Sequence, residues 1–172
     1  MKIFHKLVCY TLLAGATTLL PAIAHAAAAP SDADKEFLAK AAQSDVNEYK
    51  LSQLAVQKTS NPDVKAFAEK MVDEHMKMTL SMKPFVMAWG LTAPVDLDED
   101  HKTEYMKLNG LSGAAFDKEY MDVMVTDHTK GLDLFTDEAK DTKDAKFKAA
   151  VVKGKTIVAA HKNMAYDLQK KL

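Results

Sequence analysis

The sequence has few of the residues that mark several common classes of protein. One cysteine in 172 residues excludes a disulfide framework and a cysteine-rich metal site. Six glycines and five prolines are too few for a β-sandwich or a long disordered chain. The 23 basic and 24 acidic side chains nearly balance, so the charge does not favour a nucleic-acid partner. The sequence also contains no glycine-rich phosphate-binding loop and no recognisable nucleophile–base motif.

The chain is 48% hydrophobic, and its length is typical of one compact domain. Its longest apolar run, residues 7–20, follows a basic start and precedes Ala-His-Ala at residues 24–26. This order predicts a secretory signal peptide over residues 1–26, cleaved near Ala26, and export to a bacterial periplasm. Cleavage would remove Cys9, which suits an oxidising compartment. No later segment is long and apolar enough to predict a transmembrane helix in the mature chain.

The rest of the chain has helical periodicity and predicts no strand. Apolar residues recur three and four apart in four long segments that begin at Ser31, Asn61, Ser112 and about Lys143. Between the second and third segments the pattern fails, except for a short helical stretch at residues 98–108. We expect Pro84 to kink the second helix and Gly90 to end it.

Two helices, a long connection and two more helices predict an all-α, four-helix bundle with one crossover between helices two and three. Residues 67–77 and 120–130 align without gaps, and six positions match in kind, which indicates two related helix pairs. We assign residues 27–34 to a short lead-in and residues 35–172 to the bundle domain.

Each long helix places one polar side chain within its apolar stripe. These side chains are Glu48, His75, His128 and His161, and at ~1.5 Å per residue their depths differ by less than ~10 Å. A buried glutamate is costly unless it is paired or bound to a cation. Three imidazoles and one carboxylate at one level therefore predict a transition-metal site. The competing interpretation is a metal-free polar network in the core.

Acidic residues and methionines lie close to these four candidates. Glu74 and Asp127 precede two of the histidines, and each is expected either to hold a histidine in place or to form a surface ion pair. His101 lies in the connection and is assigned no role. Four methionines lie near the histidines and either fill the core or supply thioether ligands that favour copper over iron or zinc. They are Met71, Met78, Met124 and Met164.

Several motifs resemble a large, uncharacterised family of bacterial envelope proteins, whose members are labelled a domain of unknown function or an outer membrane protein. The similar segments are Ala41-Ala42-Gln43 with Glu48, residues 60–68, Met71-Val72-Asp73-Glu74-His75, Gly113-Ala114-Ala115-Phe116-Asp117, Asp127-His128 and His161. The resemblance spans about residues 35–170. It implies a ferritin-like fold and an envelope location, and it implies no reaction.

Three functions are compatible with these observations. The first is an exported bundle that binds iron, zinc or copper through the inward side chains. The second is a metal-free structural or stress-related interaction protein, suggested by Met76, Leu80 and Met87, which project away from the apolar stripe. The third is a ferroxidase-like or peroxide-consuming enzyme. A ferritin-type di-iron site has Glu-x-x-His on two helices, and here valines occupy the positions three before each histidine, which disfavours the enzyme. The sequence predicts no particular partner protein or oligomeric state.

Overall fold

A computed structural model describes residues 29–172, so the predicted signal peptide lies outside the described residues. Within that range the chain forms helices only, which confirms the predicted all-α class. The elements are α1 (Asp32–Lys58), α2 (Pro62–Ala88), α3 (Glu99–Gly110), α4 (Gly113–Asp141) and α5 (Ala145–Gln169). None of these helices combines the length and the apolar character needed to cross a membrane.

Polar side chains cap the starts of α1, α2, α3 and α5, whereas Ser112 before α4 makes no such hydrogen bond. Ser31 and Asp34 form a reciprocal capping box at α1, in which each side chain accepts a hydrogen bond from the backbone N–H of the other residue. Side chains of Asn61, Asp98 and Asp144 accept backbone N–H groups at the starts of α2, α3 and α5. These caps use N–H groups that have no partner within the helix, and they confirm the predicted starts to within about two residues.

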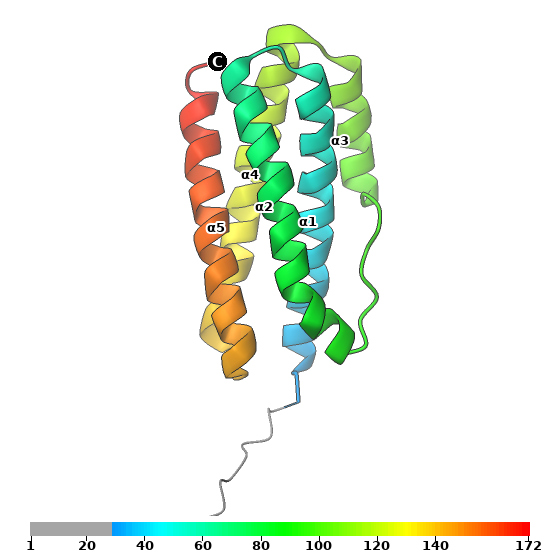
Figure 1. Ribbon diagram of the computed structural model, residues 1–172, viewed down its shortest axis with the longest axis vertical. Helices are drawn as coiled ribbons and strands as arrows, with labels where there is room; N and C mark the ends of the chain where they lie inside the picture. The colour runs from blue at the N-terminus through cyan, green and yellow to red at the C-terminus, as the bar shows by residue number, and fades with distance from the viewer. Residues whose placement is uncertain (1–28) are drawn as a thin grey trace, which may run out of the picture.

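The end of α2 follows its proline and glycine. Pro84 lies inside the helix, where it lacks an N–H group to donate. Figure 1 shows the final turns of α2 bent away from the axis of the rest, as the proline predicts. Gly90 then adopts a φ of 67°, a left-handed conformation that favours glycine. The chain leaves α2 at this point and enters the connection to α3.

The four long helices lie side by side, and α3 packs outside them against α1 and α4 (Figure 1). The most extensive packing is between α1 and α2 and between α4 and α5, and α1 also contacts α4 while α2 contacts α5. The end of α2 and the start of α4 lie at opposite ends of the molecule, so the connection with α3 runs along its length (Figure 1).

The core consists of two apolar clusters separated by a polar layer. The first cluster lies at the end of the molecule where α2 and α4 begin, and its residues include Leu51, Phe67, Met71, Phe116, Tyr120, Met124 and Ala165. The second cluster lies toward the other end and includes Phe37, Ala41, Met78, Phe135, Phe147 and Val158. Along each long helix, the polar residues predicted to face inward fall between members of the two clusters.

Candidate metal centre

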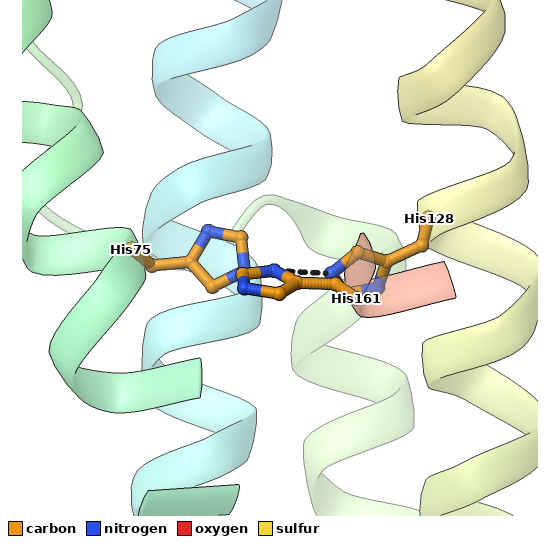
Figure 2. A group of neighbouring side chains, drawn as sticks. All are labelled: His75, His128 and His161. Carbon is orange, nitrogen blue, oxygen red and sulfur yellow. Dashed lines mark hydrogen bonds between the residues drawn. The ribbon is translucent and has the colours of Figure 1, made fainter. Parts of the chain in front are cut away.

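The structure brings the three predicted histidines together in this polar layer. His75 extends from α2, His128 from α4 and His161 from α5, and Figure 2 shows the three rings pointing toward one another. One ring nitrogen from each histidine lies within 4.8 Å of those from the other two. All three side chains are at most 2% exposed, so the protein excludes bulk water from the group.

Glu48 completes the group from α1. Its Oε2 atom lies 2.8 Å from Nε2 of His75 and 2.9 Å from Nε2 of His128. Its other oxygen, Oε1, accepts a hydrogen bond of 3.1 Å from the Ser44 hydroxyl, which fixes the carboxylate plane. The structure thus brings together the four side chains that the sequence predicted as ligands.

The outward nitrogen of each histidine binds a hydrogen-bond acceptor. His75 donates from Nδ1 to Asp45 over 2.8 Å, and His128 donates from Nδ1 to the Met124 carbonyl over 2.8 Å. His161 donates from Nε2 to Glu74 over 2.5 Å. A neutral imidazole has one N–H, so in the neutral form of each ring these bonds leave a lone pair on the inner nitrogen. Carboxylate and carbonyl acceptors orient metal-binding histidines in this way.

The inner atoms lie close enough to share a proton or a metal ion. Nε2 of His128 and Nδ1 of His161 are 3.2 Å apart, and both carry lone pairs when the two rings are neutral. Among residues 29–172, Nε2 of His75 and Oε2 of Glu48 have no partner with hydrogen-bond geometry, although the two atoms are in contact. Buried polar atoms of this kind are costly unless a proton or a metal ion satisfies them.

The charges in the site are strongly coupled. Burial opposes the charge of His75, but attraction to Glu48 and the bond to Asp45 outweigh it and raise the pKa of His75 to about 10. Burial also opposes the charge of Glu48, yet His128 and His75 hold the pKa of this carboxyl well below its usual range. Burial and repulsion from His75 lower the pKa of His161 to about 4. Without a metal ion, a proton on His75 therefore balances the Glu48 carboxylate, and a metal ion would have to displace this proton to bind Nε2 of His75.

The two predicted outer residues each contact a histidine, but not the histidine next to them in the chain. Glu74 is adjacent to His75 in the chain, but it binds His161 on α5 and also pairs with Lys70. Asp127 is adjacent to His128, but its carboxylate lies 3.3 Å from Nε2 of His101 in α3. Glu74 thus supports the histidine group, and Asp127 belongs to the contact between α4 and the crossover.

The four methionines flank the histidine layer. Met71 and Met124 are buried in the first apolar cluster, and Met164 packs against that cluster. Met78 lies in the second apolar cluster, on the other side of the layer. All four methionines thus contribute to the packing of the apolar clusters on either side of the layer.

Asp45 is the supporting residue that the sequence interpretation missed. It is 6% exposed, and it accepts hydrogen bonds from His75 at Oδ1 and from the Thr79 hydroxyl at Oδ2, the latter over 3.0 Å. Asp45 precedes Glu48 by three residues, so both side chains lie on one face of α1. The same helical spacing that identified Glu48 contained the signal for Asp45.

The residues that suggested an interaction surface are exposed. Met76 is 46%, Leu80 60% and Met87 70% exposed. Leu80 also borders an apolar cavity between α1 and α2, whereas Met76 and Met87 do not line it.

Comparisons with known proteins place the chain in a family and support its fold. The domain of unknown function DUF4142 matches residues 20–168. No curated protein matches the chain. Among solved structures, a crystal structure of a DUF305 fragment from Deinococcus radiodurans is similar, with a TM-score of 0.73 at 10% sequence identity. The match covers 83% of this chain and 98% of that chain, and at this identity it bears on the fold alone.

Proposed function

We propose a metal-binding function for this chain, which belongs to the DUF4142 family, a domain of unknown function. In this proposal the protein is an exported, ferritin-like four-helix bundle that holds one divalent transition-metal ion in its core. The ligands are Glu48, His75, His128 and His161. The observation that carries the proposal is the buried group of three imidazoles, two of which contact one carboxylate oxygen of Glu48 while the third contacts His128, with an acceptor on every outward nitrogen.

The helix arrangement supports the ferritin-like part of the proposal. Ferritin-like bundles place two antiparallel helix pairs side by side and join them by one long crossover. Here α1 packs with α2, α4 packs with α5, and the connection with α3 runs along the molecule (Figure 1). The support for export is the basic start, the apolar run and the Ala-His-Ala triplet within residues 1–26.

The donor set favours a borderline ion with low coordination number. Ligand atoms bound tetrahedrally to zinc at 2.0–2.1 Å are separated from one another by ~3.3 Å. The contacts of 2.8, 2.9 and 3.2 Å among the inner atoms are close to that spacing. Three nitrogens and one carboxylate oxygen suit zinc, iron and copper, whereas magnesium and calcium prefer oxygen ligands. To bind the ion, the shortest contact would lengthen by ~0.5 Å, and the histidine nitrogens, which lie within 4.8 Å of one another, would draw together.

Titration with cobalt(II) tests this proposal, because a tetrahedral cobalt(II) site has intense visible absorption that hydrated cobalt(II) lacks. The chelator-treated protein is expected to bind one cobalt ion and to develop these bands, and zinc is expected to displace it. His128→Ala removes one inner nitrogen and is expected to abolish the bands. Circular dichroism before the titration establishes that the variant is helical.

His101→Ala is the matched control, since His101 also lies between carboxylates but outside the core group. This variant is expected to bind cobalt as the unmodified protein does. Absence of the bands from the unmodified protein, or equal bands in the His128→Ala variant, would contradict the proposed site.

A further inference from the structure

An apolar cavity of about 280 Å³ lies between α1, α2 and the crossover, next to the histidine layer. The second apolar cluster forms its deep wall, and the connection after α2 forms part of its rim. Apolar side chains make up most of the lining, and they include Ala41, Met78, Met82, Val86, Pro94 and Phe135. Displacement of water from such a surface by an apolar molecule lowers the free energy and therefore favours binding.

The size of the cavity limits its ligand. A dry protein cavity of about 150 Å³ accommodates benzene, with six carbon atoms, so about 280 Å³ fits roughly ten or eleven non-hydrogen atoms. The cavity is also near the lower end of the range for small-molecule sites, which begins at about 300 Å³. A two-ring molecule or a medium-length aliphatic chain matches this volume, whereas a nucleotide or a large cofactor does not.

The polar end of the cavity selects for one kind of functional group. Asp45 and Thr79 line this end, and the Thr79 hydroxyl already donates its proton to Oδ2 of Asp45. The carboxylate accepts from His75 at Oδ1, and each of its oxygens retains a free lone pair. The pair can therefore accept a further hydrogen bond but has no proton left to donate. A ligand hydroxyl or N–H group complements this end, and a ligand carboxylate is repelled.

We propose that this cavity binds an uncharged, mainly apolar molecule of about ten non-hydrogen atoms whose single donor group binds Asp45 and Thr79. The site is separate from the four metal ligands, and the proposal stands whether or not the core binds metal. Lys83 lies at the rim, where its stem adds apolar surface while its ammonium group stays in solvent.

Methionine methyl resonances report on this cavity directly. Indole is the probe, because it has two fused rings and one N–H donor. Indene is its isosteric partner without the donor. In protein labelled at the methionine methyl groups, indole is expected to shift the methyl resonances of Met78 and Met82. The shifts should reach a plateau as the indole concentration rises. The signals of Met121 and Met124, which lie in the first apolar cluster, should not move.

Comparison of the two probes tests the polar end in the unmodified protein. Indole is expected to bind about two- to tenfold more tightly than indene, the value of one net hydrogen bond. Equal or tighter binding of indene would overturn the proposal. Preferential binding of octanoate would also overturn it, since Lys83 rather than Asp45 would then determine the ligand.

Filling the cavity tests its location. Ala42 lines it, so Ala42→Leu is expected to weaken indole binding about tenfold or more by occupying the ligand volume. The matched control is Ala160→Leu on the exposed side of α5, which should leave the affinity unchanged. Unchanged affinity in the Ala42→Leu variant, or absence of shifts at Met78 and Met82, would exclude this cavity as the site.

Discussion

Two regions of the molecule place a histidine between two carboxylates, and they differ in what else is present. In the core, Nδ1 of His75 binds Asp45 and its Nε2 contacts Glu48. At the crossover, Nδ1 of His101 binds Asp98 over 2.6 Å and its Nε2 binds Asp127 over 3.3 Å. Both arrangements raise the histidine pKa, to about 10 in the core and to about 9 at the crossover.

The two histidines differ in the partners of Nε2, the nitrogen that faces away from Asp45 in His75 and from Asp98 in His101. Both nitrogens of His101 have carboxylate partners with hydrogen-bond geometry, and its interactions join α3 to α1 and α4. The inner nitrogen of His75 lacks such a partner and faces two further imidazoles. A histidine between carboxylates is therefore a structural ion pair at one place and part of the proposed ligand set at the other. Convergence of further nitrogen atoms, rather than the pair itself, distinguishes a candidate metal site.

The largest expected difference between the regions is in the stability of the metal-free protein. Glu48→Gln removes the charge that balances protonated His75, and breaking a buried pair costs about 3–5 kcal/mol. Asp127→Asn removes the corresponding carboxylate from His101, in a partly exposed pair worth up to about 1 kcal/mol. Urea unfolding of the two variants at pH 7 measures both losses. Similar losses would show that the core group is not energetically distinct.

An intermediate effect is expected on metal affinity. Asp45→Asn replaces the acceptor that orients His75, and loss of such an outer partner lowers metal affinity about 10- to 100-fold. Asp98→Asn makes the same change at His101 and should leave the affinity unchanged. Competition against a zinc indicator measures both variants. Equal affinities in the two variants would contradict the orienting role of Asp45.

Helical periodicity predicted which side chains face the core, because the direction of a side chain depends only on its spacing within one helix. It identified the long helices, the inward faces and the four converging side chains. Partners on different helices were not predictable in this way. Glu74 is next to His75 in sequence, but adjacent residues point about 100° apart on a helix, so its carboxylate reaches His161 on α5 instead. The role of His101 likewise depends on how the crossover folds back onto α1 and α4.

The smallest expected effect is the pH dependence of the crossover pair. Hydrogen bonds to Asp127 and Asp98 raise the pKa of His101 from 6.5 to about 9, so the folded protein holds this proton more tightly than the unfolded chain. The stabilisation is therefore complete below about pH 6.5 and is lost as the pH rises through about 9. His101→Gln should cost about 1 kcal/mol at pH 6, as expected for a partly exposed pair, and almost nothing near pH 10. Urea unfolding of the unmodified protein and of the His101→Gln variant across this pH range measures the cost. Both proteins retain the core group, so its contribution cancels in the difference between their free energies of unfolding. A difference that grows with pH would show that the proton is not held by the two carboxylates.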